Sequence, residues 1–147
     1  MQWKIDPYEG TGPIKLGMKP EQVQKAFRPF EKTIERSSEY FNAYFPDLET
    51  PILGFRNGLL VDFGFGWRTE AVYILDTDYF HTKPNVFLQS VKRLDSGLKK
   101  SRGGNILSST FGISFDLIDL DESDKTIWAF SHEEFLPLFE KARPFED

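Results

Sequence analysis

The segment PILGFRNGLLVDFGFGW, residues 51–67, limits the possible folds of this chain more than any other stretch. Asn57 and Gly58 stand between two β-prone runs. A two-residue hairpin turn of type I′ needs a positive φ at both central positions, and Asn-Gly is the dipeptide that meets this need best. The segment therefore predicts a β-hairpin that turns at residues 57–58.

The second arm of this hairpin predicts a sheet with two different faces. One set of alternating positions is large and apolar, and the other holds an acid and two glycines: Leu59, Val61, Phe63, Phe65 and Trp67 against Leu60, Asp62, Gly64 and Gly66. Successive side chains of a strand point to opposite faces, so the first set is expected in the core and the glycines are expected to leave shallow hollows. Regular pairing would set Leu53 opposite Asp62 and Phe55 opposite Leu60. The second face is then partly apolar, and we expect either the chain's own second layer or a partner to cover it.

The remaining segments predict an α+β fold with a predominantly antiparallel sheet and short helices packed on one face. Residues 70–80 are expected to extend the hairpin into a three-stranded meander, and strands are also predicted at 37–45, 105–120 and 126–130. Pro20 and Pro84 each follow a lysine and suit the first position of a helix. Ser131 and Glu134 have the spacing of a capping box, and Pro137 predicts that this third helix is short or bent.

This pattern suggests a single domain over residues 1–147 with two tandem helix-plus-meander units, at about 12–78 and 79–147, each opened by Lys-Pro. A chain of 147 residues is long enough to bury one core without disulfides or metals. The identity between the two units is slight, so the sequence does not establish a duplication.

Composition restricts the expected compartment and partners. The chain has no cysteine, no basic flank before an apolar run at its start and no apolar run that approaches the length of a membrane span, which predicts a cytoplasmic protein with no membrane contact. The net charge of −5 argues against nucleic acid as a partner, because duplex binding depends on neutralising phosphates with lysine and arginine.

No motif in the sequence predicts catalysis, a metal or a cofactor. Asp76, Asp78 and His81 would meet at a divalent ion only if a loop brought them together, and a solvated acidic pair is the expected reading. The stretch SRGGN, residues 101–105, has a basic flank and two glycines, but it lacks the Lys-Ser/Thr ending of a phosphate-binding loop.

What remains is a surface for another protein. Aromatic residues make up 16% of the chain, and rings mixed with polar groups are typical of protein recognition patches. We expect Asp62, Trp67, Asp76 and Asp78 to lie near such a patch, with the acids steering a basic partner and the ring acting as an anchor. Burial of the patch within the same subunit, or in a self-associated dimer, would remove it from use.

Three stretches carry a resemblance to known proteins: GPIKLGMKPEQVQKAF at 12–27, VYILDTDYFHTKPNVFLQSVKRLD at 72–95 and FGISFDLIDLDESDKTIWAFSHEEF at 111–135. The first resembles the opening of small bacterial proteins with a beta-lactamase-inhibitor-like architecture. The other two resemble the second unit of related proteins found among predicted immunity proteins of toxin systems. The resemblance implies a tandem helix-and-sheet scaffold that grips another protein with its sheet face, and it transfers no binding residue.

The sequence thus favours a non-enzymatic, cytoplasmic protein-binding module, and more specifically an immunity protein that neutralises a basic toxin domain through an acidic, aromatic sheet face. The alternative is a small-molecule-binding protein or enzyme with a cavity between helix and sheet. A third reading is an assembly protein without a separable site.

Overall fold

A computed structural model describes residues 1–66, 68–117 and 125–146 and confirms an α+β fold with mostly antiparallel sheets. Its three short helices are α1 (Pro20–Ala26), α2 (Pro84–Lys92) and α3 (His132–Lys141). The strands of the first half are β1 (Gln2–Asp6), β2 (Gly10–Thr11), β3 (Ile14–Lys15), β4 (Lys32–Glu35), β5 (Tyr40–Tyr44), β6 (Ile52–Arg56) and β7 (Leu59–Gly66). Those that follow are β8 (Ala71–Ile74), β9 (Thr77–Asp78), β10 (Lys99–Lys100), β11 (Ile106–Ser108), β12 (Ile113–Phe115), β13 (Thr126–Phe130) and β14 (Arg143–Pro144).

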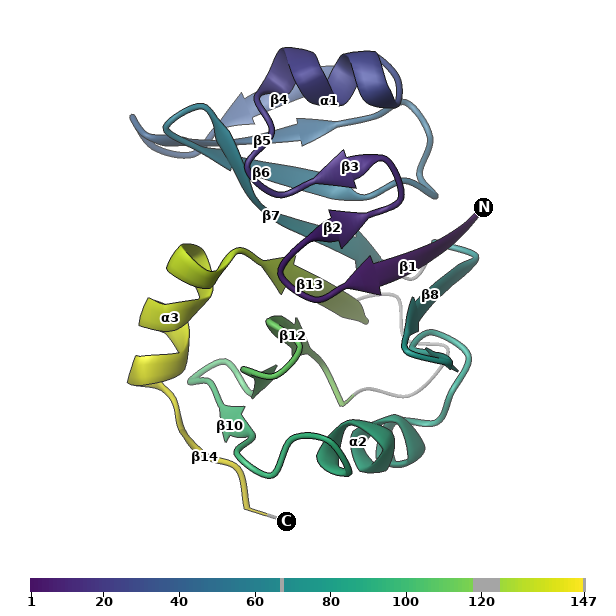
Figure 1. The fold of residues 1–147 in the computed structure, drawn as a ribbon, viewed down its shortest axis with the longest axis vertical. Coiled ribbons are helices and arrows are strands. Elements are labelled where there is room, and N and C mark those ends of the chain that lie inside the picture. The colour runs from purple at the N-terminus through teal and green to yellow at the C-terminus, as the bar shows by residue number, and fades with distance from the viewer. Residues whose placement is uncertain (67, 118–124, 147) are drawn as a thin grey trace.

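The strands form a large and a small sheet. The large sheet has nine strands in the order β14-β10-β11-β12-β13-β7-β6-β5-β4, and every neighbouring pair in it is antiparallel. The small sheet has the order β3-β2-β1-β8-β9 and contains the parallel pair β1–β8. Figure 1 shows β4–β7 in the upper part of the molecule, β10–β13 in the lower part and the N-terminal strands in front of the region where the two parts meet.

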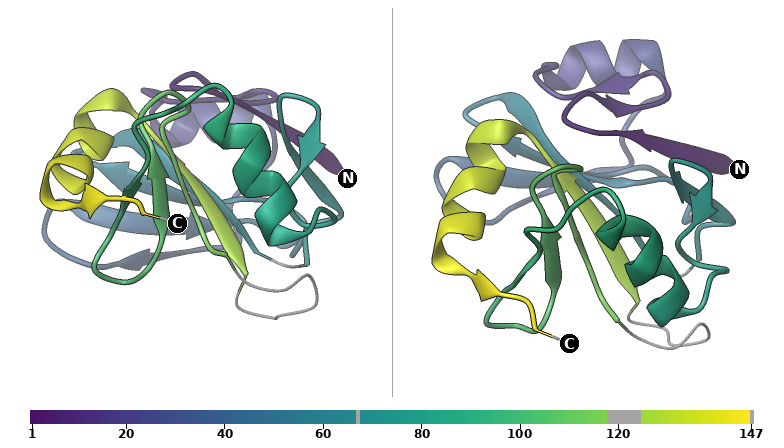
Figure 2. Two further views of the ribbon diagram at one scale, coloured as in Figure 1. Left: turned by 90° about the horizontal axis from the view of Figure 1, so that it is seen from below. Right: turned by 60° about the horizontal axis from the view of Figure 1, so that its bottom comes forward.

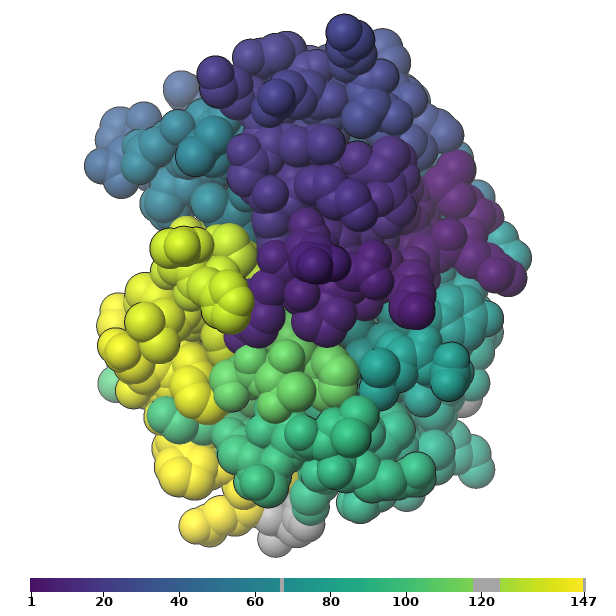
Figure 3. Space-filling model, viewed as in Figure 1, coloured from purple at the N-terminus to yellow at the C-terminus, as the bar shows by residue number. Residues whose placement is uncertain are grey.

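The main core lies between one face of the large sheet and three covering elements. Phe63 and Phe65 of β7 and Ile127 of β13 are almost fully buried on this face. The small sheet covers them through residues such as Trp3, and α1 and α2 add Val23 and Phe87 to the same cluster. In the space-filling view the N-terminal segment fills the middle of this side of the molecule (Figure 3).

Helix α3 packs on the other face of the large sheet. Its Phe135 forms a second cluster with Leu107 and Phe130, which point away from the main core. In both views of Figure 2 the strands β12 and β13 run between α3 and α2. The expected placement of the helices on one face therefore describes α1 and α2, and α3 covers part of the second face.

The two halves of the chain follow the same order of elements. A hairpin (β2–β3 or β8–β9) precedes a helix that begins at Lys-Pro, and four antiparallel strands follow, namely β4–β7 in the first half and β10–β13 in the second. The last strands of the two sets, β7 and β13, pair with each other and join the halves into one sheet. A duplication stays a prediction, because a shared order of elements is not a shared sequence.

The predicted hairpin is present, but a β-bulge changes its register. Asn57 and Gly58 have φ values of 53° and 79°, as the turn requires. A shift between Gly54 and Phe55 places Gly54 opposite Asp62 and Leu53 opposite Phe63. The expected pairing of Leu53 with Asp62 is therefore wrong, and the alternation changes phase at the bulge, so that Leu60 is buried and Leu59 is exposed.

The expected three-stranded meander is also wrong. Strand β13 occupies the edge of β7 that a third strand would need. The chain turns at Thr69, whose amide donates to the Gly66 carbonyl, and β8 then pairs with β1 in the small sheet. A strand pattern of this length does not specify which edge a strand joins.

The helices begin where the sequence predicts. Pro20 and Pro84 open α1 and α2, and the Ser131 hydroxyl caps α3 by accepting from the Glu134 amide. Helix α3 is short, as expected, but Pro137 does not end it, because α3 continues to Lys141 with Phe135 and Phe139 holding it to the sheet on both sides of the proline. No helix among the described residues is long and apolar enough to cross a membrane.

Candidate functional site

The candidate site lies on the face of the large sheet that is turned away from the main core, which we call the outer face. Pairing across β5, β6, β7 and β13 places on this face Tyr40, Asn42, Tyr44, Ile52, Gly54, Arg56, Asp62, Gly64, Gly66, Thr126 and Trp128. Helix α3 covers the end near Phe130 and Leu107. The apolar cluster beneath α3 contains no described residue of β4, β5 or β6, and on these strands Tyr44 and Ile52 are half-buried.

A chain of polar contacts fixes the centre of the outer face. The Tyr40 hydroxyl donates to Asp62, at 2.8 Å to Oδ1 and 3.0 Å to Oδ2, and accepts from Asn42 Nδ2 at 3.3 Å. Arg36 donates to Asn42 Oδ1 and, through its second nitrogen, to the Tyr44 hydroxyl, both at 2.9 Å. Because each member holds the next, the two tyrosine rings are positioned before any partner arrives.

Gly54 makes this arrangement possible. It lies between Asn42 and Asp62 in the pairing, and a Cβ at this position would overlap the Asp62 carboxylate and the Tyr40 hydroxyl. Gly64 has the same role for its neighbour, because a Cβ there would overlap the Trp128 indole. The hollow expected at Gly64 is therefore filled by a side chain from the adjacent strand β13.

Burial shifts the ionisation of the central pair. Asp62 is 5% exposed, and loss of water around its carboxylate raises its pKa to about 6, although the bond from Tyr40 opposes the shift. The same burial, with the nearby Asp62 charge, raises the pKa of the Tyr40 hydroxyl far above its ordinary value. Asp62 thus titrates close to neutral pH.

Arg56 connects the outer face to α3. Its Nε donates to Glu134 at 2.8 Å and its second nitrogen donates to the other carboxylate oxygen at 2.9 Å, while the guanidinium lies 4.9 Å from the centre of the Tyr40 ring. A bidentate contact of this kind fixes the direction of both side chains. It also neutralises both charges, so the pair offers little net charge to a partner.

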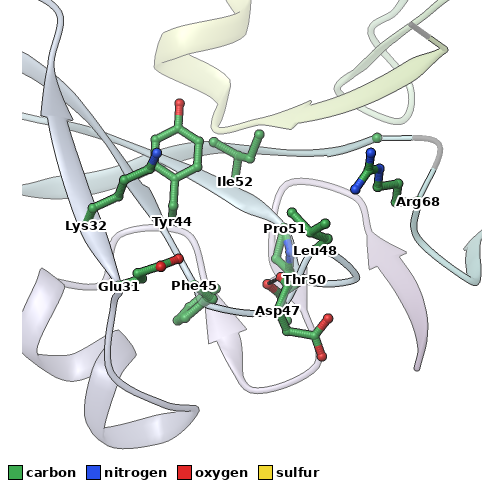
Figure 4. Close-up of a pocket in the computed structure, with 11 residues that line it drawn as sticks. Glu31, Lys32, Tyr44, Phe45, Asp47, Leu48, Thr50, Pro51, Ile52 and Arg68 are labelled. Atoms are coloured by element: carbon green, nitrogen blue, oxygen red, sulfur yellow. Dashed lines mark hydrogen bonds between the residues drawn. The ribbon is translucent and has the colours of Figure 1, made fainter. Parts of the chain in front are cut away.

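A pocket of about 390 Å³ opens at the end of the outer face where β5 turns into β6. Gly66 leaves space within it, since a Cβ there would meet no atom within 4 Å from the described segments that surround it. Figure 4 shows the other lining residues, which are Glu31, Lys32, Tyr44, Phe45, Asp47, Leu48, Thr50, Pro51, Ile52 and Arg68. The Lys32 ammonium lies 5.1 Å from the centre of the Tyr44 ring, and Leu48 is 64% exposed at the rim.

The charge of this pocket differs from the acidic face expected from the sequence. Its lining has two acids and two cations, and Asp62, the acid in the centre of the outer face, is buried. The site is therefore mixed in charge, and its largest surfaces are aromatic and aliphatic.

The predicted site residues do not come together. Asp62 lies in the outer face. Asp78 belongs to β9 of the small sheet, and Asp76 lies in the turn between β8 and β9. Trp67 lies outside the described residues. Asp78 accepts from the amides of Val72 and Phe80 and pairs with His81 at 2.6 Å, which gives it a role in the local turn. Their part in partner binding stays a prediction.

Sequence reasoning missed the residues from β5 that shape the site. In the segment SSEYFNAYF, residues 37–45, Tyr40, Asn42 and Tyr44 alternate with Phe41 and Ala43. This alternation predicts that the two tyrosine rings lie on the same face of a strand. Arg36 and Gly54 were not readable in this way, since their roles depend on the bulge and on the turn that precedes β5. Among the described residues, no group of three or more histidine, aspartate or glutamate side chains is placed to hold a metal ion.

Comparison of the chain with protein families, curated proteins and solved structures found no match in any of the three. The resemblance to inhibitor-like and immunity proteins stays a prediction.

Proposed function

We propose that this chain is a non-enzymatic binding protein that docks another protein on the open part of its outer face. The observation that carries the proposal is the unfilled space above Gly66, bordered by Tyr44 and Ile52 on strands whose other face is the main core. Binding energy in protein interfaces concentrates where a bulky side chain enters such a pocket, and a surface already held in place loses little entropy on binding.

The pocket favours a partner that presents an apolar or aromatic anchor with a carboxylate beside it. Leu48, Ile52 and Pro51 supply apolar contact to the anchor. Lys32 makes no ion pair among the described residues, so its ammonium is available to the carboxylate. A partner with such a carboxylate differs from the basic partner that the net charge suggests. The net charge is a sum over the whole chain and includes acids that lie far from this pocket.

In line with the resemblance, we propose that the docked protein is a toxin that this chain neutralises in the cytoplasm. A side chain seated in the pocket would place the partner's surface across Tyr44 and the neighbouring strands. Coverage of a catalytic cleft over such an area prevents substrate entry without any chemistry by the inhibitor.

Exposed leucines supply a matched pair of variants that test the docking site. Leu48→Asp changes the rim of the pocket, and Leu94→Asp makes the same change at a similarly exposed leucine just after α2. Gly66→Val fills the pocket itself. We expect one host protein to co-purify with the wild type and with Leu94→Asp, and its dissociation constant to rise at least about tenfold with Leu48→Asp and Gly66→Val.

The toxin role has its own readout. Expression of the captured protein alone should stop growth, and the wild-type chain should relieve this while Leu48→Asp does not. Equal binding by both aspartate variants would exclude the pocket as the docking site. A small molecule retained by the wild type and displaced by Gly66→Val would instead support the alternative of a ligand-binding protein, for which a pocket of this size is also sufficient.

A further inference from the structure

We propose that the partner docks by adding a strand of its own to the free edge of β4, in antiparallel pairing, so that the large sheet continues into the partner. This inference rests on the proposed function and states how the partner's backbone and charges are recognised. Strand addition uses the same main-chain hydrogen bonds as the sheet itself and leaves specificity to the side chains. The partner segment that follows the added strand then reaches the docking pocket, because Glu31 and Lys32 line that pocket at the start of β4 (Figure 4).

Strand β4 is the longest free sheet edge in the described part of the chain. It ends the large sheet with four residues, whereas β14 at the opposite end, and β3 and β9 at the ends of the small sheet, have two residues each. Strand β14 also contains Pro144, which has no amide to donate to a further strand. Strand β4 contains neither proline nor glycine. It is therefore the edge at which a further strand can pair.

The register of β4 determines which of its backbone groups face outward. The Arg36 amide donates to the Tyr40 carbonyl at 2.9 Å, so position 36 belongs to the hydrogen-bonded pairs with β5. Such pairs alternate along an antiparallel ladder, so the residues two and four positions earlier also direct their backbone groups toward β5. Thr33 and Glu35 therefore direct their amides and carbonyls away from β5, and no described strand pairs with that side.

Both faces of β4 leave room for a neighbouring strand. Pairing with β5 places Thr33 and Glu35 on the core side of the sheet, yet both are exposed. On the outer face Lys32 is exposed as well, and Ile34 is half-buried. The layers that cover the middle of the sheet therefore end before they reach this strand.

The charges along β4 disfavour a second copy of the chain as the added strand. A two-fold axis perpendicular to the sheet keeps each side chain on its own face, which allows only a few registers between two copies. A pair centred on one middle residue of β4 sets Glu31 opposite Glu35, and a pair centred on the other sets Lys32 opposite Arg36. A pair centred on either end residue sets Lys32 or Glu35 opposite itself. Like charges directly opposite destabilise the pairing, so each of these registers is disfavoured.

The same charges match a foreign strand with the complementary pattern. Glu31, Lys32 and Glu35 make no ion pair among the described residues. A strand with an acid opposite Lys32 and basic residues opposite the two glutamates meets an opposite charge at each position. An acid opposite Lys32 is also the carboxylate that we place beside the partner's anchor.

The first test measures binding of a blocked heptapeptide to the full chain by NMR titration. Its order is glutamate, lysine, valine, threonine, glutamate, lysine and phenylalanine, which sets its charges against residues 36 to 31 and its ring at the pocket. We expect saturable binding with slower hydrogen exchange at the amides of Thr33 and Glu35. A peptide with glutamate and lysine exchanged should bind at least about fivefold more weakly. Unchanged exchange at both amides, or equal affinity of the two peptides, would overturn the proposal.

Two variants at one position separate the backbone from the side chain. Thr33→Pro removes an outward amide, and Thr33→Ala removes the same side chain but keeps the amide. Proline is tolerated on an edge strand where the amide faces solvent, so both variants should keep the circular dichroism spectrum of the wild type. Thr33→Pro should raise the dissociation constant of the peptide at least about tenfold, and Thr33→Ala should leave it within about twofold. Equal binding by the two would contradict strand addition. If Thr33→Pro loses its fold, the exchange measurement on the wild type decides alone.

The host protein captured by the wild type distinguishes this inference from the proposed docking pocket. Loss of that protein from both Thr33→Pro and Leu48→Asp supports strand addition and the pocket together. Loss from Leu48→Asp alone keeps the pocket and overturns strand addition, whereas loss from Thr33→Pro alone supports strand addition and excludes the pocket. A dimer of the chain that Thr33→Pro disperses would assign the edge to a second copy and overturn the proposal.

Discussion

At the scale of single residues, the outer face depends on positions that have no side chain. Gly54 permits Tyr40 and Asp62 to meet above β6, and Gly64 permits the Trp128 indole to lie over β7, whereas Gly66 has none of the described neighbouring segments above it. Three glycines of similar appearance in the sequence therefore have two different roles. Two admit a neighbour, and one leaves the space in which we place the partner's anchor.

This difference predicts opposite responses to the same substitution. Gly54→Ala should lower the free energy of unfolding by about 2–4 kcal/mol, because the added carbon forces apart the Tyr40–Asp62 contact in a closely packed region. Gly66→Ala should change it by no more than about 0.5 kcal/mol, because its methyl group enters open space. Urea unfolding followed by circular dichroism measures both, and an equal loss in the two variants would contradict this account of the face.

Asp62 should make stability depend on pH. Its pKa is raised in the folded state to about 6, from the ordinary value of 3.8 for an aspartate, so the folded chain binds the proton more tightly than the unfolded chain. The resulting stabilisation is complete below about pH 4, is lost as the pH rises through 6 and amounts to about 3 kcal/mol.

The variant Asp62→Asn keeps an oxygen for the Tyr40 hydroxyl and removes the buried charge. We expect it to be more stable than the wild type at pH 7.5 by about 1–3 kcal/mol, with a smaller loss of stability between pH 4.5 and 7.5. Thermal unfolding of both proteins across this range measures the difference. An unchanged pH profile would show that Asp62 is solvated and charged throughout.

At the scale of elements, α3 decides how much of the outer face is closed. Phe135 and Phe139 anchor it over Leu107 and Phe130, and its Glu134 pairs with Arg56 of β6. It continues through Pro137, which donates no hydrogen bond to the preceding turn. Packing against the sheet therefore outweighs a local preference that would otherwise end the helix.

Removal of that proline tests the balance. Pro137→Ala should raise the free energy of unfolding by about 1 kcal/mol or more, because it restores an amide donor inside an existing helix at an exposed position. Ser131→Ala, which removes the hydroxyl that accepts from Glu134, should lower it by about 1 kcal/mol. Denaturant melts of the two variants provide the comparison, and a loss of stability in Pro137→Ala would mean that the proline is needed for the path of the helix.

At the scale of the whole molecule, the pairing of β7 with β13 joins the two halves into one cooperative structure. The pair extends over five residues of each strand, from Thr126 opposite Gly66 to Phe130 opposite Asp62. The cluster that fills the main core draws residues from both halves, so neither half buries its apolar face alone.

We therefore expect the chain to unfold in a single transition. Far-ultraviolet circular dichroism, which follows both halves, and tryptophan fluorescence should give the same urea midpoint. Two separated transitions would show that the predicted units at 12–78 and 79–147 fold independently and that the shared sheet is not what stabilises them.

The sequence by itself determined the parts of this protein that rest on neighbouring residues. Asn57-Gly58 specified the hairpin, the two Lys-Pro pairs specified where helices begin, and Ser131 specified a cap, since each of these effects acts within one turn of the backbone. Together with the strand-rich pattern they sufficed for the α+β class and the antiparallel sheet.

Only the tertiary structure decided what depends on contacts between distant segments. The bulge at Gly54 placed Leu60 instead of Leu59 in the core, whereas Phe63 and Phe65 face the core as the alternation predicts. The edge of β7 went to β13 instead of β8, and Tyr40 met Asp62, which lies 22 residues further along the chain. Register and edge choice follow from the packing of complete layers, and a shift of one residue moves every side chain to the opposite face. For this reason the alternation in the sequence predicted a two-faced sheet, while the identity of the residues on its open face had to come from the fold.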